Sequence, residues 1–290
     1  MKLKGLFFAA ALALTSYAAH AEGFSDTWWG VRDALTASNV GGNPGDEKGS
    51  RNVNKVIFNT GHFDIWDYGE NFFSIDVLLS NPNEAANNSS GGSTELYGVY
   101  RTQLSPDKIF GLNTKFGPFR EINLELGGDL ETENNAFSPN KKMIIFGPNF
   151  HMDVPAGFLN IGVHGYKEWN NNGFCADSCT KPGGPVTFDM APEFEIVWLF
   201  PLTFTHQPID FRGFFNIVLP KGKTGFGSQT ATEYLTRPAI YVDIGDLIMH
   251  KPHKLYAYAQ LELWLHKFGN QSNVAGSTEV SPVFGVEYHF

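Results

Sequence analysis

Charged, amide and aromatic side chains recur at every second position in several segments of the chain. In the segment 118–128, Glu121, Asn123 and Glu125 alternate with aliphatic residues. Because successive side chains of a β-strand point to opposite faces, this spacing predicts a strand with one polar and one apolar face. Carboxylate and amide oxygens accept hydrogen bonds, arginine donates them, and aromatic rings stack on flat solutes. Such a face could therefore bind solutes that carry hydroxyl groups and a flat ring.

The same assignment of faces extends to other segments. In 254–267, alternate positions carry Leu or Ala on one side and polar or aromatic residues on the other. The segment 186–200 places Asp189 on its polar face as well. We predict that the residues contacting a solute are Asp76, Glu95, Tyr97, Arg101, Glu121, Glu125, Glu193, Glu195, Arg212, Tyr258, Glu262 and Trp264. The alternative is a packed interior in which these charges only pair with one another.

The residues that could take part in catalysis do not indicate an enzyme. Ser74, His206 and Asn216 are present, but no recognisable motif joins them into a nucleophilic triad such as a barrel phospholipase would need. The sequence therefore predicts a protein that is not an enzyme, without a cofactor or a metal ion. The net charge of −9 argues against a nucleic-acid-binding surface, which would require clustered Lys and Arg.

The elements that position these residues are predicted to be about twelve strands, an even number as in bacterial outer-membrane barrels. Long breaks rich in Gly, Asn and Ser alternate with shorter ones, as outer loops alternate with inner turns in such barrels. The predicted fold is therefore an all-β, antiparallel transmembrane β-barrel. A soluble β-sandwich is the alternative, and Trp28-Trp29 could instead begin a short interfacial helix. The strands are expected at 28–38, 51–63, 71–80, 94–104, 118–128, 142–152, 157–169, 186–200, 208–219, 232–244, 254–267 and 279–290.

The start of the chain has the pattern of a secretory signal peptide. Lys2 and Lys4 precede an apolar stretch, and Ala19-His-Ala21 resembles a cleavage site. The apolar stretch is shorter than the roughly 20 residues of a membrane-spanning helix. We therefore expect a signal peptide at 1–21 and an outer-membrane barrel at 22–290. A mean hydropathy of −0.20 is compatible with a barrel, whose strands alternate lipid-facing and interior residues.

The end of the chain alternates apolar and polar residues up to its terminal aromatic, Phe290. This pattern is typical of the closing strand of an outer-membrane barrel and less so of a frayed terminus. Glu279, Glu287 and His289 share the polar face. We predict that this strand pairs with the first one and that these three side chains point inward.

Cys175 and Cys179 are the only cysteines. An exported chain meets an oxidising compartment, so they are predicted to form a disulfide that closes a small loop. A metal site is the alternative, but without a nearby His the two sulfurs would leave its coordination incomplete.

Three segments resemble the Tsx-like nucleoside-specific outer-membrane channels, a family that includes the OmpK-type barrels. They are Trp66-Asp-Tyr-Gly-Glu-Asn-Phe-Phe-Ser-Ile-Asp76, Glu95-Leu-Tyr-Gly-Val-Tyr-Arg101 and the terminal Val-Glu-Tyr-His-Phe290. Two departures are Glu70, where the family pattern leads us to expect Asp, and the Cys175–Cys179 loop. The resemblance implies a monomeric, twelve-stranded barrel that passes nucleosides by diffusion, with Asp76, Glu95, Tyr97 and Arg101 in the lumen.

The sequence thus predicts a passive channel in the bacterial outer membrane, in contact with its lipid, for nucleosides or similar small solutes. Two alternatives remain: a surface receptor barrel that binds a phage or colicin at its outer loops, and a general porin without nucleoside selectivity.

Overall fold

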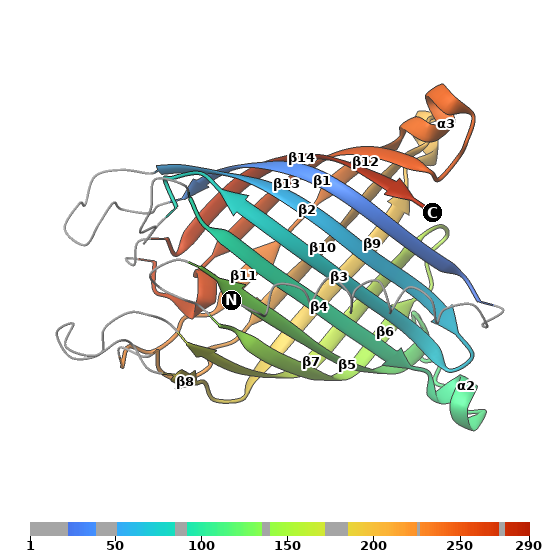
Figure 1. Cartoon of the computed structure of the whole chain (residues 1–290). Coiled ribbons are helices and arrows are strands. Elements are labelled where there is room, and N and C mark those ends of the chain that lie inside the picture. Colours follow the sequence, from blue (N-terminus) through green and yellow to red (C-terminus); the bar gives the residue numbers. More distant parts are fainter. Residues whose placement is uncertain are drawn as a thin grey trace, which may run out of the picture.

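The structure is a computed structural model that describes residues 23–38, 51–84, 92–134, 140–171, 185–224, 227–272 and 276–290. Its strands form one antiparallel sheet that closes on itself (Figure 1). The strands are β1 (Ser25–Ser38), β2 (Arg51–Trp66), β3 (Gly69–Ser80), β4 (Thr94–Leu104), β5 (Phe119–Glu133), β6 (Lys142–Met152), β7 (Phe158–Asn171), β8 (Pro185–Thr187), β9 (Ala191–Pro201), β10 (Ile209–Val218), β11 (Glu233–Thr236), β12 (Ala239–Asp243), β13 (Leu255–Leu265) and β14 (Thr278–His289).

Two positions around the barrel are each occupied by two consecutive strands separated by a break. Both β8 and β9 pair with β7, and both β11 and β12 lie between β10 and β13. Counting each pair as one interrupted strand gives a closed barrel of twelve strands. The predicted fold is confirmed, and every predicted strand has a counterpart within a few residues of its expected bounds.

The first and last strands close the barrel. β1 pairs with β14 from Trp28 opposite His289 to Ser38 opposite Glu279. The helix considered for Trp28-Trp29 is wrong, because both residues lie within β1, where the ladder to β14 satisfies their backbone. The rings of Trp29 and Tyr288 each make an edge-to-face contact with the ring of Phe290. Aromatic packing therefore fixes the end of the chain.

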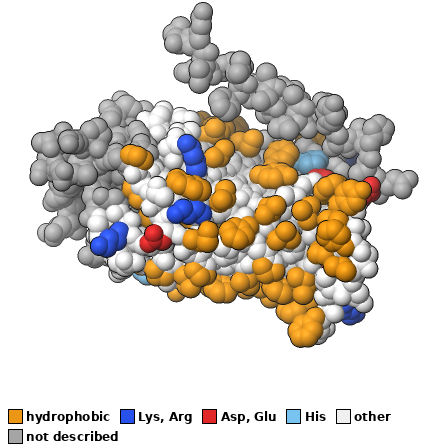
Figure 2. All heavy atoms as spheres, turned by 90° about the horizontal axis from the view of Figure 1, so that it is seen from below, with side chains coloured by type: hydrophobic (Ala, Val, Ile, Leu, Met, Phe, Trp, Pro, Cys, Tyr) orange, Lys and Arg blue, Asp and Glu red, His pale blue; other side chains and the backbone are white. Residues whose placement is uncertain are grey.

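The outer surface of the barrel is apolar. Val31, Phe58, Phe146 and Phe284 are among the large hydrophobic residues that remain exposed on it. Figure 2 shows apolar side chains spread over the wall. The outward-facing residues of a soluble barrel are expected to be polar. The apolar outer surface of this barrel is suited instead to contact with lipid. The helices of the described residues include none that is long and apolar enough to cross a membrane.

Short connections and the end of the chain lie at the right of Figure 1. β2 and β3 are joined by the two residues 67–68. A Cβ on Gly69, just after this turn, would lie 1.7 Å from the carbonyl oxygen of Gln103, so the close approach of β3 to β4 requires glycine. This end corresponds to the inner face of the outer membrane, where turns are short.

Two of the connections at this end contain short helices. Helix α2 (Pro106–Phe110) has Ser105 as its N-cap and Gly111, at φ 65°, as its C-cap. Helix α3 (Ile244–Met249) begins after Asp243, whose carboxylate accepts a hydrogen bond from the backbone of Asp246. These two capped helices account for the two inner connections that are longer than a tight turn.

Candidate functional site in the barrel interior

Inward-facing side chains of the strands are predominantly polar, and acids are far more numerous among them than Lys or Arg. The Lys and Arg side chains that are described on the inner face of the strands include Arg32, Lys55, Arg101 and Arg212. Against them stand many carboxylates, several of which are almost fully buried. The inward acids of the described strands include Asp26, Glu70, Asp76, Glu95, Glu121, Glu125, Asp129, Glu131, Glu168, Glu193, Glu195, Asp210, Glu233, Glu262, Glu279 and Glu287.

One polar group joins β1, β2 and β3. The guanidinium of Arg32 forms an ion pair with Asp76, and each side chain keeps 11% of its area exposed. The amide of Asn59 donates hydrogen bonds to Asp76 and to Ser74, and its oxygen accepts one from the indole of Trp28. Because every partner is itself bonded, this network fixes the orientation of the Asp76 carboxylate.

An aromatic group lies on the neighbouring part of the wall, on β10, β12 and β13. The rings of Tyr241 and Tyr258 are stacked, with centroids 4.5 Å apart and planes inclined by 15°. The guanidinium of Arg212 lies 4.4 Å from the ring centroid of Tyr241 and 4.5 Å from that of Tyr256. Its own partner is Asp210, at 2.6 Å. Arginine stacked on tyrosine offers both a flat surface and N–H donors.

A third group faces these from β4, β5, β7 and β9. Arg101 forms an ion pair with Asp129 at 2.7 Å and lies 3.9 Å from Glu125. Its side chain crosses Gly127, where a Cβ would lie 2.5 Å from Cδ of Arg101, so glycine leaves the space that the arginine occupies. Glu193 and Glu195 on β9 also interact electrostatically with Arg101. Acids outnumber cations in this group.

The outer half of the interior is packed with paired charges. Lys221, which is 1% exposed, forms an ion pair with Glu168 and lies 3.4 Å from Glu233. Lys267 pairs with Glu279 at 2.5 Å. Burial alone would lower the pKa of Lys267, but the carboxylate of Glu279 raises it above its ordinary value. This half of the barrel therefore follows the alternative prediction, in which interior charges pair with one another.

The sequence-predicted site residues all lie on inward-facing positions, but they do not form one site. Arg101, Glu125, Glu193 and Glu195 come together as one group, and Tyr97 belongs to it through its hydrogen bond to Asp129. Their role in binding a solute remains a prediction. The others lie outside this group: Asp76 beside Arg32, Arg212 and Tyr258 in the aromatic group, Glu262 beside Arg237, Glu95 beside Lys55, Glu121 beside Ser105, and Trp264 beside Glu233.

One predicted site residue fits solute contact poorly, and one residue predicted to face inward does not do so. Trp264 is 8% exposed, because its indole donates to Glu233 and Lys267 lies over its ring. Asp189 is exposed in the break between β8 and β9, and is not an inward residue of a strand. A break in a strand resets the alternation of faces, and the sequence around Asp189 does not reveal it.

Several interior residues escaped the sequence analysis. Arg32 and His164 lie on strands that were predicted, and the alternation of polar with apolar neighbours would have identified both. Lys221 follows β10 in a segment that was predicted to be a loop, and no periodicity marks it as buried. The predicted signal peptide and the Cys175–Cys179 pair lie outside the described residues.

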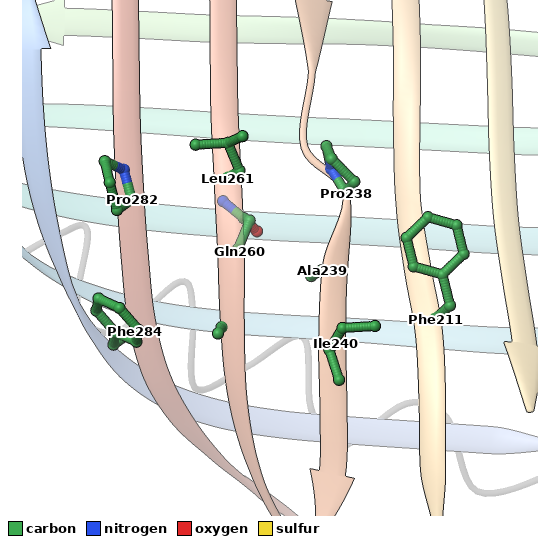
Figure 3. Close-up of a pocket in the computed structure, with 9 residues that line it drawn as sticks. Phe211, Pro238, Ala239, Ile240, Gln260, Leu261, Pro282 and Phe284 are labelled. Carbon is green, nitrogen blue, oxygen red and sulfur yellow. The ribbon is translucent and has the colours of Figure 1, made fainter. Parts of the chain in front are cut away.

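A hollow of about 310 Å³ on the outer surface is an apolar feature of the lipid side (Figure 3). It lies where Arg237 and Pro238 separate β11 from β12, since proline cannot donate to the ladder. Phe211, Ile240, Leu261 and Phe284 line it from neighbouring strands. Its lining has no charged group, so it does not add to the polar site inside.

A closed barrel with an apolar exterior and a polar interior defines a β-barrel protein of the bacterial outer membrane, which confirms the predicted location. No protein-family model and no curated protein matches the sequence. Among solved structures, the COG4313 outer-membrane channel from Pseudomonas putida F1 has a TM-score of 0.51 and 10% identity, with 92% of this chain and 95% of that one covered.

Two further structures are similar at lower scores. The KdgM porin in complex with disordered oligogalacturonate has a TM-score of 0.46 and 11% identity, with 91% of this chain and 99% of that one covered. The outer-membrane protein opdK from Pseudomonas aeruginosa has a TM-score of 0.40 and 8% identity, with 92% of this chain and 99% of that one covered.

Proposed function

We propose that this protein is a passive outer-membrane channel selective for nucleosides or similar small solutes. The observation that carries the proposal is the partly exposed strip of the interior wall formed by Arg32, Asp76, Arg212, Arg237 and Tyr241. The side chains of Arg212 and Arg237 are 21% and 30% exposed, against 11% for Arg32 and 12% for Arg101. This strip contrasts with the packed outer half of the interior.

The strip supplies two kinds of contact that a nucleoside could use. The guanidinium of Arg212 is planar and lies over the ring of Tyr241, and stacking a base on such a planar surface contributes about 1–3 kcal/mol. The Asp76 carboxylate and the guanidinium of Arg237 can accept and donate hydrogen bonds to ribose hydroxyls. Each charge also has a partner in the wall, and this moderates its attraction for a solute. Sites of moderate strength suit passage, because a solute must leave as readily as it binds.

The resemblance to the Tsx-like channels supports the nucleoside part of this proposal. Its most specific segment runs from Trp66 to Asp76, and the Asp76 carboxylate ends in the strip beside Arg32. The family would also make the protein a monomer. A general porin could have the same strip and still show no preference for nucleosides. The decisive experiment must therefore compare solutes.

The experiment is single-channel conductance in planar bilayers, with nucleosides and sugars of similar size added separately. We expect nucleosides to block the current at lower concentration than sugars do. Tyr241→Leu should weaken nucleoside block by about tenfold, since the guanidinium of Arg212 loses the ring that positions it for a stacking contact of about 1–3 kcal/mol. Tyr100→Phe, on the lipid face, is the matched control. Equal block by both solutes would indicate a general porin, and no current at all would reject the channel.

A further inference from the structure

The carboxylates of Glu125 and Glu195 converge on a single imidazole in the barrel interior. Glu125 lies on β5, His164 on β7 and Glu195 on β9, and one ligand atom from each can be chosen so that all lie within 4.8 Å of one another. The ring of His164 lies over Gly162, where a Cβ would be 2.3 Å from Cε1 of the imidazole. Glycine at this position therefore allows the ring to turn toward the two acids.

His164 is buried and has unsatisfied nitrogens. The residue is 3% exposed, and within the described parts of the chain neither ring nitrogen has a hydrogen-bond partner. Nε2 nevertheless lies 3.3 Å from Glu125 Oε2, and Nδ1 lies 3.4 Å from Glu193 Oε2. Because these carboxylates are not aligned for hydrogen bonding, the single in-plane lone pair of a neutral imidazole stays free to bind an ion. A buried polar group without a partner is costly, so this arrangement calls for a ligand.

The charge of the group also favours a cation. Glu125, Glu193, Glu195 and Asp129 surround this point, and the described cations that act on them include Arg101, Lys141 through its interaction with Asp129 and, when protonated, His164. Buried carboxylates are strongly destabilised unless a positive charge compensates them. A divalent ion would supply the compensation that Arg101 alone does not.

The spacing matches metal coordination. Zn²⁺ binds His nitrogen at about 2.0–2.1 Å and carboxylate oxygen at about 2.0–2.2 Å, in tetrahedral geometry. Two ligand atoms of such a site lie about 3.3 Å apart, which is the observed separation of His164 Nε2 from Glu125 Oε2. A co-ligand at this position lies off the axis of the nitrogen lone pair, because the ion itself occupies that axis. This accounts for short contacts that are not hydrogen bonds.

We propose that Glu125, His164 and Glu195 bind a divalent transition-metal ion inside the barrel, with Zn²⁺ as the ion their chemistry suits best. One imidazole with carboxylates favours Zn²⁺ and similar ions over Mg²⁺ or Ca²⁺, which prefer oxygen alone. The fourth position is open to water, while Glu193 lies at the other ring nitrogen, Nδ1. Asn149 donates a hydrogen bond to Glu125 and orients its carboxylate as an outer partner of the site.

The experiment measures metal binding by the folded, untagged full-length barrel in detergent, so that no affinity tag contributes histidines. Zn²⁺ is titrated by calorimetry in excess Mg²⁺, and Co²⁺ is added as a probe whose visible spectrum reports its ligands. We expect one ion per barrel and a Co²⁺ spectrum that indicates imidazole ligation. His164→Ala and Glu195→Gln should each weaken binding by at least about tenfold.

His151→Asn is the matched control, because His151 is an equally buried inward histidine on the adjacent strand β6. Its imidazole is hydrogen-bonded to Gln103 and should not affect the affinity. The shift in gel mobility on boiling verifies that each variant is folded, and the near-isosteric Glu195→Gln tests the site should His164→Ala fail to fold. Absence of Zn²⁺ and Co²⁺ binding by the wild type would overturn the proposal and would favour a protonated His164 between two carboxylates. Undiminished affinity in folded His164→Ala or Glu195→Gln would overturn it as well.

Discussion

Arg32 on β1 reaches across β2 to pair with Asp76 on β3, and both side chains remain partly exposed to the interior. The pair therefore has a structural and a potential functional role at the same position. Structurally, the pair links the first strand of the barrel to the third strand. Functionally it presents a donor and an acceptor side by side, on the face that we propose contacts a solute.

Replacing Asp76 with Asn should weaken nucleoside block of the current by about tenfold. A hydrogen bond to a charged group contributes about 1.5–3 kcal/mol, and the neutral amide is a weaker acceptor for a ribose hydroxyl. The measurement is the nucleoside concentration that halves single-channel current. Glu70→Gln removes a carboxylate at the inner end of the interior and should change this concentration little. Identical block in wild type and Asp76→Asn would exclude Asp76 from solute contact.

The excess of interior carboxylates should make the channel cation-selective. Clustered charge of one sign raises the local concentration of counter-ions in a narrow polar passage. Under a KCl gradient, the reversal potential should show K⁺ permeating better than Cl⁻, and Glu193→Gln combined with Glu195→Gln should reduce this preference severalfold. Asp33→Asn is the control, since this exposed acid of β1 lies on the opposite face from Arg32. Anion selectivity in the wild type would contradict the expectation.

Loss of Lys221 should destabilise the barrel strongly. Removing one partner of a buried ion pair costs about 3–5 kcal/mol, because the other charge remains buried and uncompensated. Lys221→Met should therefore leave Glu168, which is 0% exposed, without its main partner. Urea unfolding of the barrel in detergent measures the loss. Adding Glu168→Gln should recover a large part of it, and a loss below about 1 kcal/mol in the single variant would show that the pair is not structural.

Strand alternation accounts for how much of this fold the sequence predicts. The position of each strand and the inward face of residues such as Arg101 and Glu125 follow from a period of two and from loop spacing. The grouping of these residues does not, because it depends on register across several strands and on the tilt of the barrel. Thus Trp264 and Tyr258, on the same face of β13, end in unrelated surroundings.

Contacts made by residues from irregular segments were also beyond prediction. Lys221 and Lys267 lie in connections at the outer end of the barrel, and their side chains extend into the interior. Nothing in their local sequence distinguishes them from solvated loop lysines. The breaks at 188–190 and 237–238 likewise depend on how these segments pair with neighbouring strands. The alternation of polar and apolar residues along one strand carries no information on that pairing.

Lys267 provides a test at alkaline pH. The nearby carboxylate of Glu279 raises the pKa of Lys267 above its ordinary value of 10.5, against the effect of burial. A group whose pKa is higher in the folded than in the unfolded state stabilises the fold fully below the unfolded value, and this stabilisation is lost as the pH rises through the folded value. Wild type should therefore exceed Lys267→Met in its urea midpoint by a constant amount from about pH 8 to about pH 10, and this advantage should decline only at higher pH. The exposed Lys115→Met should show no such decline. An advantage that already shrinks below pH 10 would mean that Glu279 does not hold the charge of Lys267 in the folded barrel.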